Sequence, residues 1–300
     1  MAEPIVMYCK SYEGDIHRVE RLWQSIEAYN ANQLRFYISV PERDIADFKK
    51  RLPHDSLLTL LTDEEIVSVG PGDGLKHYRE WPGQLSQQVV KSEFWRLDAC
   101  ESYLLLDSDN VFIRPFRRGD FLSPDNTPYT VITQGKEFRQ LSLNKGIEKI
   151  QRNFLYESQL LKRIFERSGP DYDFGIPPVV WSKKVWSDLY EKYLAPRRML
   201  FWDAITLAPI ELRWYGEALL KYRSIPLIPV EPFFRSYLYS WQYYHLKKNG
   251  ETLDTLKEHY LGVVYQSNWQ TSLDSISKKY KKNFISRNIR DLKLLLSRFR

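Results

Sequence analysis

Two carboxylates that follow a short apolar run are the residues best placed for chemistry in this 300-residue chain. Asp107 and Asp109 flank Ser108 and come directly after the apolar residues 103–106. The apolar run predicts a buried strand, and ligands of open α/β sheets bind at the carboxyl ends of the strands. Mg²⁺ and Mn²⁺ prefer oxygen ligands and are often held by one or two carboxylates together with substrate phosphates. The pattern therefore predicts a Mn²⁺ or Mg²⁺ site at Asp107 and Asp109.

The residues before this motif predict alternating strands and helices. Strands are expected at 4–9, 34–40, 66–69 and 103–106, and helices at 16–29, 42–52 and 82–99. Such an alternation predicts an α/β fold with a mixed, mostly parallel sheet flanked by helices. A polar loop at 10–15 follows the first strand. The glycine-rich loop at 70–74 is followed by neither a Walker lysine nor a GxGxxG helix entry.

The second half of the chain predicts less regular structure. We expect strands at 129–133 and 225–230, helices at 145–167, 182–193 and 205–222, and a loop at 169–178. The domain prediction is a single unit at 1–275, with halves at about 1–120 and 121–275 that share one sheet. A basic amphipathic helix is predicted at 276–300, where it could lie on an anionic membrane surface.

Three motifs lie close together between residues 72 and 115. They are Trp81-Pro82-Gly83 with a paired glutamine and Lys91, the run Tyr-Leu-Leu-Leu-Asp-Ser-Asp ending at Asp109, and Phe112-Ile113-Arg114-Pro115. This stretch resembles the core of GT-A glycosyltransferases, and in particular a bacterial family of presumed DxD-containing glycosyltransferases. The resemblance implies a Rossmann-like GT-A fold, a divalent metal and a nucleotide-sugar donor, most simply a UDP- or GDP-sugar. It also implies a glycan or lipid-linked glycan acceptor, in bacterial surface polysaccharide synthesis.

The resemblance assigns donor contacts to several positions. Tyr12, in the loop after the first strand, is expected to stack on the base, and Lys91 is expected to reach the donor phosphates. Only one glutamine of the pair can face the donor, because neighbouring helical residues point about 100° apart. The residues assigned to donor binding are Lys10, Tyr12, Asp15, Gln88, Lys91, Asp107, Ser108 and Gly175.

The acceptor side is assigned by the same resemblance. Glu211 corresponds to the acidic position that serves as general base in inverting members, although Leu212 replaces the usual aspartate. Inversion is preferred over retention, in which Glu211 would only position the acceptor, and Tyr215 is expected beside that acceptor. His259 is assigned as a third metal ligand with Asp107 and Asp109. A second Asp-x-Asp at 171 and 173 follows no predicted strand and ranks below the first.

Composition narrows the class of protein. The chain has 43% hydrophobic and 27% charged residues, as globular proteins do, and a net charge of +6 that lies largely after residue 278. Cys9 and Cys100 fit no metal-binding spacing and are expected to be reduced core thiols. The N-terminus lacks a signal peptide, and no apolar run reaches 18 residues. These features predict a cytoplasmic protein, either free or bound peripherally to the inner face of the plasma membrane.

Two other functions fit parts of the sequence. A nucleotidyltransferase making a nucleotide sugar would use the same core and metal, but its usual first loop is rich in glycine, arginine and lysine, whereas only Lys10 is present here. A nucleic-acid-binding protein would suit the basic tail and the aromatic content. Because carboxylates repel phosphate unless a metal intervenes, Asp107 and Asp109 argue against nucleic acid as a partner.

Overall fold

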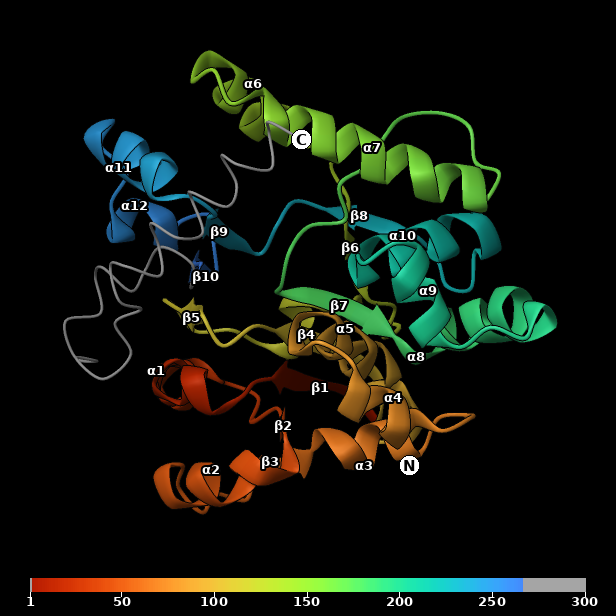
Figure 1. Cartoon of the computed structure of the whole chain (residues 1–300). Helices are drawn as coiled ribbons and strands as arrows, with labels where there is room; N and C mark the ends of the chain where they lie inside the picture. The colour runs from red at the N-terminus through yellow and green to blue at the C-terminus, as the bar shows by residue number, and fades with distance from the viewer. Residues whose placement is uncertain (1, 267–300) are drawn as a thin grey trace, which may run out of the picture.

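The computed structural model describes residues 2–266. At the centre of the molecule lies a mixed sheet (Figure 1). Its strands are β1 (Glu3–Lys10), β2 (Phe36–Val40), β3 (Leu58–Thr62), β4 (Cys100–Leu106) and β7 (Val179–Ser182). They lie in the order β3-β2-β1-β4-β7, with the first four parallel and β7 antiparallel to β4. The predicted fold class, a mixed and mostly parallel sheet flanked by helices, is confirmed.

Helices cover both faces of this sheet. The α-helices of the described residues are α1 (Ile16–Tyr29), α2 (Ile45–Arg51), α3 (Asp63–Ser68), α4 (Gly74–Glu80), α5 (Gly83–Glu93), α6 (Lys136–Asn144), α7 (Glu148–Ile164), α8 (Lys183–Leu189), α9 (Phe201–Leu207), α10 (Glu211–Tyr222), α11 (Ser240–Lys248) and α12 (Leu253–Lys257). Successive side chains of a strand point to opposite faces. Met7 and Cys9 of β1 pack with α1 and α2, whereas Val6 and Tyr8 pack with α5 and α8–α10. Burial on both faces explains why β1 and β4 are nearly continuous apolar runs.

Two smaller sheets extend the fold. Strands β5 (Asn110–Phe112), β9 (Phe234–Tyr237) and β10 (Gly262–Tyr265) form one, in the order β5-β10-β9. Strands β6 (Tyr129–Val131) and β8 (Ile228–Val230) form a parallel pair. In Figure 1, α6 and α7 lie at the top, on the side of the molecule opposite to α2 and α3. Strand β10, late in the sequence, pairs antiparallel with β5, the strand that directly follows the Asp-Ser-Asp motif.

The predicted strand at 66–69 is wrong, because these residues belong to α3 and the segment that follows it. The third parallel strand is β3, which the sequence analysis missed. Thr62 ends β3 and caps α3: its hydroxyl accepts from Glu65 N, and the Glu65 carboxylate accepts from Thr62 N at 2.6 Å. This capping box begins a helix at Asp63, so that Ile66 and Val67 are buried on a helical face.

Three predicted helices have different limits. The helix expected at 82–99 ends at Glu93, followed by a 3-10 turn and by Asp98 with a left-handed φ of 56°. The helix expected at 182–193 is preceded by β7, which was not predicted. The helix expected at 205–222 is interrupted at 208–210, so that Glu211 begins α10 and does not lie in mid-helix.

Within residues 2–266, none of the helices combines the length and apolar character needed to cross a bilayer. The basic helix predicted at 276–300 lies outside the described residues.

Candidate active site

The Asp-Ser-Asp motif lies where the connections of the central sheet change direction. From β1 the chain passes through α1 to β2 on one side, whereas β4 pairs with β1 on the other. Ligands of open α/β sheets bind in the crevice outside the strand ends at such a switch point. Ser108 Oγ donates to Asp15 Oδ2 at 3.1 Å and so joins the loop after β4 to the loop after β1. Asp15 also accepts from Arg18.

Asn110 holds the motif in a tight turn. Its backbone N donates to Asp107 O at 3.0 Å, and its side-chain Oδ1 accepts from Asp107 N at 2.9 Å. Its Nδ2 donates to Pro177 O at 3.4 Å, in the loop that precedes β7. The sequence analysis did not assign a role to Asn110. Asparagine is a common turn-former through contacts of this kind, and that property is the signal that could have identified it.

Lys91 lies between two acidic groups. Its Nζ is 2.6 Å from Asp107 Oδ1 and 3.8 Å from Glu211 Oε1, and its side chain is buried. Burial lowers the pKa of Lys91, but the carboxylates of Asp107 and Glu211 outweigh it and hold the pKa above its ordinary value. The ammonium group therefore stays charged and links the end of β4 to the start of α10. For the predicted contact with donor phosphates, Lys91 would have to bind the phosphates while it keeps its contacts with Asp107 and Glu211.

Glu211 is the first residue of α10 and is buried. An acidic side chain is stabilised at a helix N-terminus by the exposed backbone N–H groups. Burial nevertheless raises the pKa of Glu211, with Lys91 acting in the opposite direction. A carboxylate with a raised pKa is a stronger proton acceptor near neutral pH. Its position and environment suit a general base.

The carboxylates of Asp107 and Asp109 fit a divalent ion that is shared with a ligand. The Asp107 side chain is 36% exposed, whereas Asp109 is 6% exposed overall. No cluster of three or more histidine, cysteine or acidic side chains within residues 2–266 could form a protein-only metal cage. Mg²⁺ and Mn²⁺ commonly keep waters and use one or two carboxylates plus substrate phosphates, and this donor set satisfies that need.

His259 does not lie with these carboxylates. It is exposed in the turn before β10, whereas the opposite end of β10 approaches the motif through Tyr265 N, which donates to Asp109 O at 3.3 Å. The antiparallel pairing of β10 with β5 places Gly262 beside Phe112, so His259 lies beyond the far end of the pair. The predicted set of Asp107, Asp109 and His259 is therefore not assembled.

The loop after β1 contains residues predicted to meet the nucleotide. Tyr12 is 50% exposed and its ring lies over Gly14, where an added Cβ would be 2.5 Å from Tyr12 Cε2. The Lys10 ammonium is instead 3.1 Å from Oδ2 of the buried Asp63. Tyr12 is thus available for stacking, whereas Lys10 is held by an internal ion pair.

Gln88 is the more buried glutamine of the pair, on the α5 face toward the core. Its Nε2 donates to Gln84 O at 3.4 Å. Gln88 lies one helical turn before Lys91 on α5, and its side-chain contact is within that helix.

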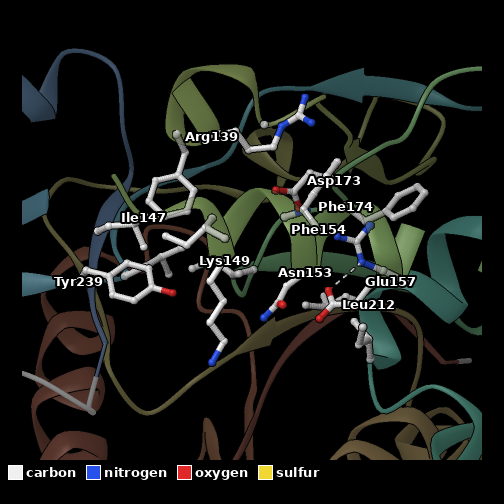
Figure 2. Close-up of a pocket in the computed structure, with 18 residues that line it drawn as sticks. Arg139, Ile147, Lys149, Asn153, Phe154, Glu157, Asp173, Phe174, Leu212 and Tyr239 are labelled. Atoms are coloured by element: carbon white, nitrogen blue, oxygen red, sulfur yellow. Dashed lines mark hydrogen bonds and ion pairs between the residues drawn. The ribbon is translucent and has the colours of Figure 1, made fainter. Parts of the chain in front are cut away.

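A cavity of about 580 Å³ lies at the start of α10 (Figure 2). Its walls come from α6, α7, the loop at 173–176, the start of α10 and the segment joining β9 to α11. Ile210, Leu212 and Arg213 line it, whereas Glu211 is not among the lining residues and has its carboxylate 3.8 Å from Lys91 Nζ. Gly175 also lines it, with a left-handed φ of 80° and its N–H donating to Asp173 Oδ1 at 3.0 Å.

The second Asp-x-Asp has structural partners. Asp171 Oδ1 is 2.9 Å from Lys162 Nζ, and Asp173 accepts from Gly175 N. These contacts explain the pair as part of the loop that shapes the cavity.

Tyr215 does not face the cavity. It is 3% exposed, and its hydroxyl accepts from Ser182 N at 2.8 Å. The ring stacks on Trp181, with the ring centroids 5.6 Å apart. Tyr215 is therefore not one of the residues that line the cavity, because its side chain packs toward the sheet.

Residues 4–281 match the family described as Family of unknown function (DUF6492), and the chain belongs to that family. No curated protein matches the chain in sequence. The similar solved structures include the galactosyltransferase LgtC in complex with donor and acceptor sugar analogs, at 12% identity over 86% of each chain with a TM-score of 0.46. They also include the bifunctional glycosyltransferase WbbM, at 11% identity over 88% of this chain and 45% of WbbM, with a TM-score of 0.47.

Proposed function

We propose that this member of the DUF6492 family is a metal-dependent glycosyltransferase that uses a nucleotide-sugar donor, a UDP- or GDP-sugar, and a hydroxyl of a glycan or lipid-linked glycan acceptor. The observation that carries the proposal is the Asp-Ser-Asp motif at the switch point of the sheet, hydrogen-bonded to the loop after β1 and linked through Lys91 to Glu211. In this proposal the donor lies at the loops after β1 and β4, and the acceptor lies near the start of α10.

The donor would occupy the crevice between the loops after β1 and β4. The exposed ring of Tyr12 is available to the base, and Asp15 lies beside Ser108 where the ribose would sit. A divalent ion shared by Asp107, Asp109 and the donor phosphates would supply the positive charge that stabilises a departing diphosphate. Asp109, as the more buried carboxylate, would be the fixed ligand, and the more exposed Asp107 would complete the site.

Glu211 would accept the proton of the acceptor hydroxyl. It begins α10, next in sequence to the cavity-lining residues Ile210 and Leu212, with Lys91 3.8 Å away as a neighbouring positive charge. An acceptor in the cavity could present its hydroxyl to Glu211 from the side opposite to the donor, which favours inversion of configuration. If the enzyme retains configuration, Glu211 would orient the hydroxyl without removing its proton.

A nucleotidyltransferase would use the same edge of the sheet. Lys10 is the residue that such an enzyme would direct at the triphosphate from the β1 loop, and here it is paired with the buried Asp63. This pairing favours the glycosyltransferase.

The direct test is a thermal-shift panel of UDP-, GDP-, CMP- and dTDP-sugars, each with and without Mn²⁺. One nucleotide class should stabilise the wild-type protein only when Mn²⁺ is present, because ligands that bind the folded state alone raise its stability. Asp109→Asn should abolish that shift, whereas Asp47→Asn, on the exposed surface of α2, should leave it unchanged. The absence of a shift with every nucleotide, together with tight binding of nucleic acid, would rule the proposal out.

A further inference from the structure

The cavity beside Glu211 has mostly apolar walls, which is unusual for a site that would hold only a sugar. Figure 2 shows Ile147 and Tyr239 at one end and Phe174 and Leu212 at the other. Phe138 and Tyr239 are nearly parallel, with ring centroids 6.1 Å apart, and add a flat aromatic wall. Pockets of 300–1,000 Å³ with apolar linings typically bury most of a ligand's surface, and the volume of about 580 Å³ lies in this range.

Two cationic side chains of the cavity have no acidic partner within residues 2–266. They are Arg139 on α6 and Lys149 on α7. The Arg139 guanidinium lies 4.5 Å from the ring centroid of Phe154, held by a cation–π contact and not by a carboxylate. Its Nε is buried and has no hydrogen-bond partner among the described residues. A buried donor without a partner is costly, so a ligand oxygen that reached the Arg139 guanidinium would relieve this cost.

The remaining charged groups of the cavity are already engaged. The Arg213 guanidinium also lies over the Phe154 ring, 4.8 Å from its centroid, and its Nη1 donates to Tyr172 O at 2.8 Å. Arg213 Nε is also 3.6 Å from Glu157 Oε2. Asp173 accepts from Gly175 N. The acidic side chains therefore do not compensate Arg139 or Lys149, and a negatively charged ligand would do so.

We propose that this cavity binds the carrier portion of the acceptor, and that the carrier is a single apolar chain ending in a phosphate ester. The inference rests on the proposed function, in which the acceptor reaches Glu211 from this cavity. The apolar walls would take the chain, and Arg139 would take the phosphate, since arginine is a usual phosphate-binding side chain, whereas the Lys149 ammonium lies at the opposite end of the cavity in Figure 2. Leu212 would then separate the carrier from the proton acceptor Glu211.

The test measures binding of farnesyl phosphate to the full-length protein by isothermal titration calorimetry, below the concentration at which the ligand forms micelles. Farnesol, inorganic phosphate and dioctanoyl phosphatidic acid are the comparison ligands. Farnesyl phosphate should bind at least about tenfold more tightly than each of them, because it alone supplies one chain and one phosphate together.

Three variants define where the ligand binds. Arg139→Gln should weaken farnesyl phosphate binding about tenfold or more, because it removes a charge-assisted contact. Ile150→Trp, which fills part of the cavity, should weaken farnesyl phosphate and farnesol together. Arg152→Gln, on an exposed position of the same helix as Lys149, should change neither.

The same preparations, assayed for the Mn²⁺-dependent nucleotide shift, separate the two proposals. If the nucleotide shift is present but farnesol or phosphatidic acid binds as well as farnesyl phosphate, the carrier inference is wrong and the proposed function stands. Equal weakening by Arg152→Gln and Arg139→Gln would also overturn the carrier inference. If the wild-type protein shows no Mn²⁺-dependent thermal shift with any nucleotide, the proposed function is contradicted instead.

Discussion

The two sides of the candidate active site are built in different ways. The donor side consists of loops at the carboxyl ends of β1 and β4, two adjacent strands whose side chains are buried on both faces. The acceptor side is a cavity among α6, α7, α10 and connecting segments, and it has no strand of the central sheet in its wall. A sheet edge fixes its ligands rigidly, whereas a cavity among helices and loops can change its chemistry without altering the sheet. Lys91 and Glu211 join the two sides. If the sides act independently, a substitution on one side should change binding or transfer on that side alone.

The largest effect is expected at Glu211. Glu211→Gln should lower the rate of sugar transfer by about 10²- to 10⁴-fold, the usual contribution of a general base, and should leave metal-dependent donor binding intact. Transfer to an acceptor and nucleotide-dependent thermal shift are measured on the same preparation. Glu258→Gln, which changes an exposed glutamate far from the cavity, is the matched control. Transfer at the wild-type rate in Glu211→Gln would show that Glu211 is not the base.

The second effect concerns the link between the two sides. Lys91→Met should lower the free energy of unfolding by about 3 kcal/mol, because removal of one partner leaves a buried carboxylate without its counter-charge. Urea unfolding measures this change. Lys91→Arg keeps the charge and should retain most of the stability, while its larger head group disturbs the 2.6 Å contact with Asp107. Equal stability of Lys91→Met and wild type would show that the buried ion pair does not hold the two sides together.

A smaller effect is expected at the base of the cavity. Gly216 lies under the ring of Phe174, and an added Cβ would overlap that ring. Gly216→Ala should therefore displace the loop at 173–176, with overpacking of about 1–3 kcal/mol partly offset by the better helix propensity of alanine. Acceptor KM should rise while the donor-dependent thermal shift is retained. A loss of donor binding of the same size would mean that the two sides are not separable.

The smallest effect is expected on the donor side, at the contact between the loops. Ser108→Ala removes the 3.1 Å hydrogen bond to Asp15 and should cost about 1 kcal/mol of stability. Nucleotide affinity should fall by a few-fold, and acceptor KM should not change. Differential scanning calorimetry and donor titration measure the two quantities. A change in acceptor KM alone would contradict the assignment of this contact to the donor side.

The donor side was largely predictable from the sequence. The strand β4 and the carboxylates after it are adjacent in the chain, and the apolar run and the polar turn indicate them directly. Helix α1 was predicted with its observed limits because its apolar residues repeat on one face. The strand predicted at 66–69 failed because Ile66 and Val67 are apolar in a helix as well as in a strand, and the capping residues Thr62 and Glu65 were not used.

The contacts that complete the site could not be predicted. Lys91, Asp107 and Glu211 are brought together only when α10 packs beside α5, which depends on packing of segments more than 100 residues apart. The contact of Arg139 with Phe154 was missed for a different reason, because α6, which carries Arg139, was not predicted at all. His259 was assigned from its type and its place late in the chain, whereas the antiparallel pairing of β10 directs it away from the carboxylates.

The most direct measurement of the central claim is Mn²⁺ binding followed by electron paramagnetic resonance, with and without the nucleoside diphosphate selected by the thermal-shift panel. The described residues supply no third ligand beside the two carboxylates, which should bind Mn²⁺ weakly alone and tightly with the diphosphate. Because the free diphosphate itself binds Mn²⁺, the free-Mn²⁺ signal should fall further in the ternary mixture than with protein alone or with diphosphate alone. Asp109→Asn should return the signal to the level seen with diphosphate alone. Tight Mn²⁺ binding without nucleotide, or unchanged ternary binding in Asp109→Asn, would contradict a donor-metal site at the end of β4.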